Sequence, residues 1–155
     1  MSLATEIIEV AKEKGIMIAA AESCTGGMVT AALTDIPGAS AVVERGFVTY
    51  TNAAKIEMLG VSAATLDAHG AVSEEVAAEM ARGALAHAPV QLAVSITGIA
   101  GPGGSEFKPE GRVCFGLADA AGTRTETVEF GALGRSAVRE AARDHALQLL
   151  LRALT

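Results

Sequence analysis

Two side chains that can act as nucleophiles, Ser23 and Cys24, are neighbours in the segment Ala-Ala-Glu-Ser-Cys-Thr-Gly-Gly of residues 20–27. The segment follows an apolar run, 15–21, and precedes a helical pattern, so we expect a strand-to-helix turn. A helix N-terminus offers unpaired backbone N–H groups and a positive dipole end, which suit an anionic group or a developing oxyanion. Ser-Cys-Thr can equally serve as helix-capping residues and Gly-Gly as a turn. The segment alone is therefore compatible with a catalytic or a structural role.

The elements that must position this turn alternate between helix and strand. Apolar residues at helical spacing predict helices over 3–14, 24–33, 74–85 and 134–153, and a short helix from Asn52, as its cap, to Gly60. Apolar runs predict buried strands over 16–21, 41–50 and 90–96, with a bulge or a close backbone approach at Gly46. A hairpin is predicted over 112–118 and 123–130, with the more polar second strand nearer the edge of the sheet.

This alternation predicts an α/β fold, a three-layer α/β/α sandwich whose mixed sheet is mostly parallel with one antiparallel member. The 155 residues fit one domain, 1–155. In such sheets ligands bind beyond the carboxyl ends of the strands. Three polar segments follow predicted strands, 23–27, 49–55 and 97–104, and we expect them to converge. The loop over 102–109 is long enough to act as a lid.

Composition and charge exclude several classes of function. The net charge of -6 argues against nonspecific binding to nucleic acid or to an anionic membrane. No apolar run is long enough to span a bilayer. Cys24 and Cys114 lack metal-ligand spacing and suit a reducing cytoplasm, where we expect the protein to act. The three histidines are isolated, so we predict an enzyme without a metal or other cofactor. His145 is expected to be partly buried, with its ring hydrogen-bonded. An Ala- and Val-rich domain of this size is also compatible with a homo-oligomer.

Four motifs together resemble a known family. These are Glu22-Ser-Cys-Thr-Gly-Gly27, Gly46-Phe-Val-Thr-Tyr50 with Asn52 and Lys55, His69-Gly-Ala-Val-Ser73, and Ser95-Ile-Thr-Gly-Ile-Ala-Gly-Pro-Gly-Gly104. In this order they cover nearly the whole chain and are similar to the CinA C-terminal family, here in its stand-alone form. That family includes nicotinamide-nucleotide amidases, which release ammonia from nicotinamide mononucleotide to give nicotinate mononucleotide. The resemblance implies this activity and this small-molecule substrate.

Residue by residue, the resemblance implies Ser23 as the nucleophile, with Tyr50 and Lys55 as its activating partners. Amide hydrolysis needs a nucleophile, a base, an acid for departing ammonia and donors for the oxyanion. Lys55 lies in the first turn of a predicted helix, where burial and the helix dipole would both disfavour its ammonium form. Tyr50, the only tyrosine, could relay a proton between serine and lysine. Cys24 is the rival nucleophile, since a thiolate at a helix N-terminus is acidified.

Substrate binding needs a phosphate site and contacts to the ribose and the carboxamide. Arg135 and Arg139, one helical turn apart, are candidates for the phosphate, although a solvated charged face explains them equally well. The remaining candidates offer hydroxyl or backbone groups: Thr25, Gly26, Gly27, Ser40, Thr97 and Gly98. Two other functions stay open, a catalytically inactive nucleotide-binding domain and an interaction domain linked to competence or DNA damage. The first of these would not need Ser23, Tyr50 and Lys55 together.

Overall fold

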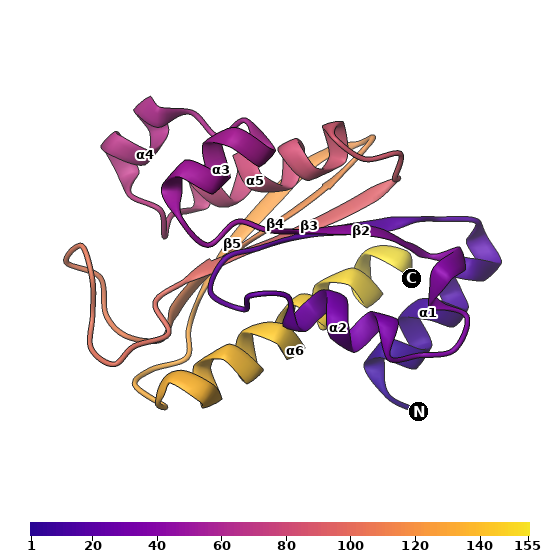
Figure 1. The fold of residues 1–155 in the computed structure, drawn as a ribbon. Helices are drawn as coiled ribbons and strands as arrows, with labels where there is room; N and C mark the ends of the chain where they lie inside the picture. The colour runs from indigo at the N-terminus through magenta and orange to yellow at the C-terminus, as the bar shows by residue number, and fades with distance from the viewer.

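A five-stranded mixed sheet forms the middle layer of the computed structural model, which describes residues 1–155 (Figure 1). The strand order is β2-β1-β3-β4-β5. Strand β1 pairs in parallel with β2 and β3, whereas β4 runs antiparallel to β3 and β5, so β4 alone points the opposite way. The strands are β1 (Ile18–Glu22), β2 (Val43–Val48), β3 (Leu92–Gly98), β4 (Arg112–Asp119) and β5 (Gly122–Glu129). The predicted mixed sheet with one antiparallel member is confirmed, and β5 is the predicted edge strand.

Helices cover both faces of this sheet. Figure 1 shows α1, α2 and α6 on one face and α3, α4 and α5 on the other. The helices are α1 (Leu3–Lys14), α2 (Met28–Thr34), α3 (Asn52–Leu59), α4 (Ala63–His69), α5 (Glu74–Ala86) and α6 (Arg135–Leu154), with a short 3-10 helix, η1 (Ala39–Ala41). The predicted three-layer α/β/α sandwich is therefore confirmed.

Strand alternation divides the apolar residues of β1 between two cores. Ile18 and Ala20 belong to the larger core beneath α1, α2 and α6, and Ala19 and Ala21 belong to the core beneath α3, α4 and α5. Successive side chains of a strand point to opposite faces. Small side chains on β1 let both helical layers approach the centre of the sheet closely.

Two local predictions were wrong, the start of α2 and the N-cap of α3, and one helix, α4, was missed. Helix α2 begins at Met28 and not at residue 24, because Gly26 and Gly27 adopt φ of 58° and 112° and keep residues 23–27 in a turn. Helix α4 was not predicted, because its seven residues bury only Leu66 and so show no helical stripe. The N-cap of α3 is Thr51 rather than Asn52. The close approach predicted at Gly46 is confirmed, since a Cβ there would collide with the side chain of Thr30 on α2.

Candidate active site

A cavity of about 350 Å³ opens beyond the carboxyl ends of β1 and β3. All three polar segments contribute to its lining, as predicted. Its lining residues are Ser23, Cys24, Tyr50, Asn52, Lys55, Ala71, Val72, Thr97, Gly98, Ile99, Ala100, Gly101, Pro102, Gly103, Gly104, Ser105, Glu106 and Arg135. A volume in this range suits a small organic ligand.

Ser23 and Lys55 meet at the inner end of this cavity. The Lys55 Nζ lies 3.0 Å from the Ser23 Oγ, and both residues are buried. The alternation of β1 explains the direction of Ser23: its backbone N–H continues the ladder to Ile96, and its side chain turns to the face that carries α3. The structure thus joins a hydroxyl and an amine from segments 32 residues apart.

Two backbone carbonyls orient the Lys55 amine. Its Nζ donates to the carbonyl oxygens of Thr49 at 3.0 Å and Tyr50 at 3.2 Å. Its third contact, to the Ser23 Oγ, is likewise one in which Nζ donates. Once the amine is neutral it has two N–H groups and one lone pair, so the two carbonyl bonds would leave the lone pair for the Ser23 hydroxyl. Burial lowers the pKa of Lys55 below its ordinary value, which favours this neutral form. The lysine is therefore placed to accept a proton from the serine.

The Tyr50 side chain lies elsewhere. It is exposed, and its hydroxyl accepts a 2.7 Å hydrogen bond from the Arg135 guanidinium. Only the Tyr50 carbonyl contacts Lys55. In this structure the tyrosine hydroxyl makes no hydrogen bond to Ser23 or Lys55, so it does not bridge them.

Cys24 borders the cavity but belongs to the opposite core, among the residues beneath α2 and α6. Burial raises its thiol pKa to about 11. The expected acidification requires a position at a helix N-terminus, whereas α2 begins only at Met28. A thiol with this pKa carries almost no thiolate at neutral pH, which disfavours Cys24 as the nucleophile.

The sequence analysis missed the structural role of Glu22. This fully buried carboxylate accepts hydrogen bonds from the Thr25 hydroxyl at 2.6 Å, the Val29 N–H at 2.9 Å, and the Thr30 N–H and hydroxyl at 2.9 and 2.8 Å. Helix α2 has no side-chain cap of its own, since Gly27 occupies its N-cap. Glu22 therefore caps α2 from the adjacent strand and fixes the turn that carries Ser23. The strand alternation could have indicated that Glu22 faces inward.

The two predicted phosphate ligands have different surroundings. Arg139 donates to the carbonyls of Cys24 at 2.9 Å and Thr25 at 3.3 Å, so it fastens α6 to the turn and is not in the cavity lining. Arg135 lines the cavity, is exposed, and donates to the carbonyl of Gly101 at 2.7 Å as well as to Tyr50. Arg135 is the only exposed cation among the lining residues.

The other predicted binding residues are also separated by the fold. Thr97 and Gly98 line the cavity, with the Thr97 hydroxyl donating to the Ala71 carbonyl. Thr25 is buried against Glu22, and Gly26 and Gly27 shape the turn. Ser40 lies in η1, just before β2 begins and so beyond the opposite end of the sheet. It does not line the cavity.

Other features of the molecule lie apart from this cavity. A hollow of about 530 Å³ between α6 and strands β4 and β5 is lined by Leu149, Arg152 and Arg124 among others, and contains no serine, cysteine or lysine. No three His, Cys, Asp or Glu side chains are grouped to hold a metal ion. His145 is partly buried and bonds to Glu126 at 2.6 Å, as the sequence predicted. None of the helices combines the length and apolar character needed to cross a bilayer.

Comparisons with known proteins agree on one relationship. Residues 1–154 match the CinA C-terminal domain family. The chain is 52% identical over 151 residues to the nicotinamide-nucleotide amidohydrolase PncC of Escherichia coli K12, covering 97% of this chain and 92% of the relative. It is 57% identical over 122 residues to a CinA-like protein of Chlorobium phaeobacteroides, but that match spans only 29% of the relative's length. The crystal structure of the competence/damage inducible protein CihA from Agrobacterium tumefaciens superposes with a TM-score of 0.94 at 48% identity, covering 98% of this chain and 93% of the other.

Proposed function

Because the chain belongs to the CinA C-terminal domain family, we propose that it is a nicotinamide-nucleotide amidohydrolase. Its reaction converts nicotinamide mononucleotide and water to nicotinate mononucleotide and ammonia. The similarity to PncC over nearly the full length of both chains supports this activity. The observation that carries the proposed mechanism is the buried 3.0 Å contact between Ser23 and Lys55.

In this mechanism, Ser23 attacks the carboxamide carbon while its proton passes directly to the neutral Lys55 amine. The backbone N–H of Cys24, a residue that lines the cavity, donates to no backbone carbonyl, and we propose it as a donor for the tetrahedral oxyanion. As the carbon–nitrogen bond breaks, the Lys55 ammonium protonates the amide nitrogen, which leaves as ammonia. An ester to Ser23 remains.

Water completes the cycle. Lys55, neutral again, takes a proton from a water molecule as that water attacks the ester carbon. Collapse of the second tetrahedral intermediate releases the nicotinate carboxylic acid and returns a proton through Lys55 to Ser23. No proton relay through the Tyr50 hydroxyl is needed, because the two reacting groups are already in contact. Tyr50 contributes its carbonyl to the orientation of Lys55.

Arg135 is proposed to bind the phosphate of the substrate. It is the exposed cation of a cavity in a chain whose net charge is -6, so it provides the local positive charge that an anionic substrate needs. The Tyr50 hydroxyl accepts a hydrogen bond from one N–H of this guanidinium and so helps to orient it. We propose the cytoplasm as the site of action because Cys24 and Cys114 are both free thiols.

The test is ammonia release from nicotinamide mononucleotide by the purified protein in the presence of a chelator. Ser23→Ala and Lys55→Ala are expected to lower kcat by about 100-fold or more, whereas Cys24→Ala keeps it within a few-fold. Loss of activity in Cys24→Ala with retention in Ser23→Ala would reverse the assignment of the nucleophile. No release by the wild type would leave a non-catalytic nucleotide-binding or interaction domain.

A further inference from the structure

A tight hairpin, residues 105–108, contributes Ser105 and Glu106 to the cavity lining. The backbone N–H of Ser105 donates to the Lys108 carbonyl at 2.9 Å, and the reverse bond is 2.8 Å. The two central residues, Glu106 and Phe107, have φ of 52° and 64°. Such a turn normally uses Asn-Gly, because other side chains are strained at positive φ. Strained residues of this kind persist where the surrounding structure fixes them, and they cluster at functional sites.

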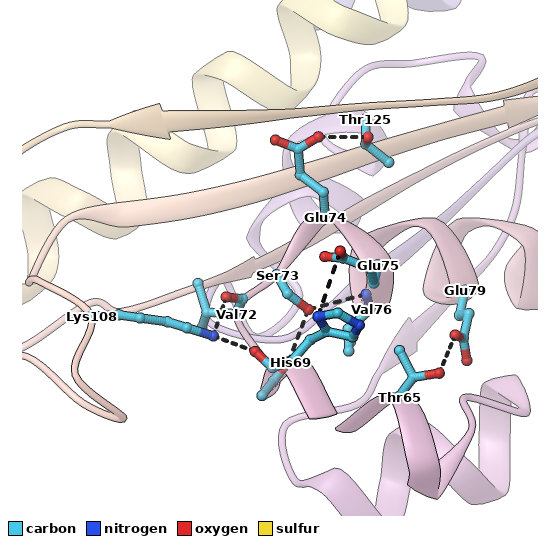
Figure 2. Close-up of polar contacts among 11 residues, drawn as sticks. Thr65, His69, Val72, Ser73, Glu74, Glu75, Val76, Glu79, Lys108 and Thr125 are labelled. Atoms are coloured by element: carbon cyan, nitrogen blue, oxygen red, sulfur yellow. Dashed lines mark hydrogen bonds and ion pairs between the residues drawn. The ribbon is translucent and has the colours of Figure 1, made fainter. Parts of the chain in front are cut away.

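Lys108 fixes the hairpin to the connection between α4 and α5. Its ammonium donates to the carbonyl oxygens of His69 and Val72, both at 2.6 Å (Figure 2). That connection is itself held at the start of α5, where the Ser73 hydroxyl caps the helix and Glu75 lies 3.6 Å from the His69 ring. The hairpin therefore has a defined position relative to the cavity.

This position brings the Glu106 carboxylate over Gly70, where any Cβ would collide with it. Glu106 is the only carboxylate that lines the cavity with Ser23. It forms no hydrogen bond through its side chain and no ion pair with any protein group. Its acceptor oxygens are thus free to bind a ligand that donates hydrogen bonds.

Three sets of side chains in the cavity differ in chemistry: the Ser23–Lys55 pair, the Arg135 cation and the Glu106 carboxylate. Ser23 and Lys55 act on the carboxamide, and Arg135 suits the phosphate, which leaves the ribose of a mononucleotide unassigned. A ribose presents two neighbouring hydroxyl groups, and a carboxylate can accept a bond from each. Acidic side chains bind ribose hydroxyls in this way in dinucleotide-binding folds. We propose that Glu106 binds the ribose hydroxyl pair of the substrate and so selects a ribonucleotide. This inference rests on the proposed function.

Glu106 also acts on Lys55 through its charge, since its carboxylate opposes the lowering of the Lys55 pKa. Removing Glu106 can therefore change catalysis for a reason unrelated to the ribose. The experiment must separate recognition of the hydroxyl groups from this electrostatic effect, and a substrate without the hydroxyls does so.

The experiment compares kcat/KM for nicotinamide mononucleotide and its 2′,3′-dideoxy analogue in the wild type and Glu106→Ala. The wild type is expected to prefer the ribose substrate by about tenfold or more, as for hydrogen bonds to a charged group. Glu106→Ala should lose most of this preference. The pH profiles of both enzymes give the pH values at which Lys55 is ionised to the same extent, and at those values Glu106→Ala should turn over the dideoxy analogue as well as the wild type does. An equal loss on both substrates, with the preference intact, would overturn the assignment.

Two further variants distinguish the loss of the Glu106 carboxylate from a general change in the conformation of the hairpin. Phe107→Ala alters the fully exposed neighbour on the same turn, which does not line the cavity, and should keep the ribose preference. Lys108→Met removes the anchor while leaving the carboxylate, and should reduce the preference by releasing Glu106. If the wild type turns over neither substrate, the proposed function is refuted. If it turns over both without any ribose preference, only the role of Glu106 is refuted.

Discussion

At the scale of single residues, Lys55 shows how function and stability oppose each other. It lies in the first turn of α3, and the residue is only 1% exposed. Three contacts, to Ser23 and the carbonyls of Thr49 and Tyr50, replace water around it. The burial that lowers the pKa of Lys55 also destabilises the folded protein when the amine is charged.

The pH dependence of activity follows from this lowered pKa. Lys55 must be neutral to accept the Ser23 proton, so kcat/KM is expected to rise with pH through the Lys55 pKa. That midpoint should lie below the ordinary lysine value of 10.5. A pH–rate profile of ammonia release measures it. A flat profile over the range in which the protein stays folded would contradict Lys55 as the base.

The same shift makes a prediction for stability. Between the lowered folded pKa and the higher unfolded one, the unfolded chain binds more protons, so Lys55 makes stability rise with pH in that window. At lower pH the buried ammonium opposes folding. Lys55→Met should therefore abolish ammonia release and raise Tm at neutral pH. It should also remove the contribution of Lys55 to the increase of stability with pH. Thermal melts at several pH values test it, and a lower Tm for the variant at neutral pH would refute it.

At the scale of elements, the turn between β1 and α2 depends on Glu22. The carboxylate accepts four hydrogen bonds in a buried site, and two of them come from the first-turn N–H groups of α2. Glu22→Ala leaves those donors buried and unpaired, so we expect a loss of about 3 kcal/mol in the free energy of unfolding and a large loss of activity. Denaturant unfolding measures the first quantity.

Thr30→Val is the matched control for Glu22. It removes only one hydroxyl bond to the carboxylate and should lower the free energy of unfolding by about 1 kcal/mol. If the Glu22→Ala variant loses no more stability than Thr30→Val, the carboxylate does not organise the turn.

At the scale of the whole molecule, the active site depends on how closely α5 packs against the sheet on one side and against α3 on the other. Gly116 of β4 lies against the Ala77 backbone of α5, and Gly83 of α5 lies against the backbone at Leu59, the end of α3. A Cβ at either glycine would collide with that backbone. Helix α3 carries Lys55 and the sheet carries Ser23, so these contacts across α5 help to set the distance between the two catalytic groups.

Gly83→Ala tests this dependence. Helix propensity alone predicts a gain of about 1 kcal/mol, whereas the collision with Leu59 costs about 1–3 kcal/mol and displaces α3. We expect the collision to dominate, so both Tm and kcat fall. Arg82→Ala, an exposed position on the same helix, is the control and should change neither substantially. A stabilised and fully active Gly83→Ala would show that α3 and α5 have room to adjust.

The order of the elements, the three-layer architecture and the strand-end segments that carry Ser23 and Lys55 could all be predicted from the sequence. These features depend on local periodicity, on caps such as Ser73 before α5, and on strand alternation, which separates Ser23 from Cys24. Such patterns act over a few residues and are visible in the chain itself.

The hydrogen-bond partners of several side chains became known only from the three-dimensional structure. Tyr50 bonds to Arg135 rather than to Ser23, Arg139 holds the turn, Ser40 lies at the far end of the sheet, and Glu22 caps α2. The start of α2 and the presence of α4 were also missed. The physical reason is that a hydrogen bond between groups many residues apart depends on where several elements meet, and no short pattern in the chain records that meeting.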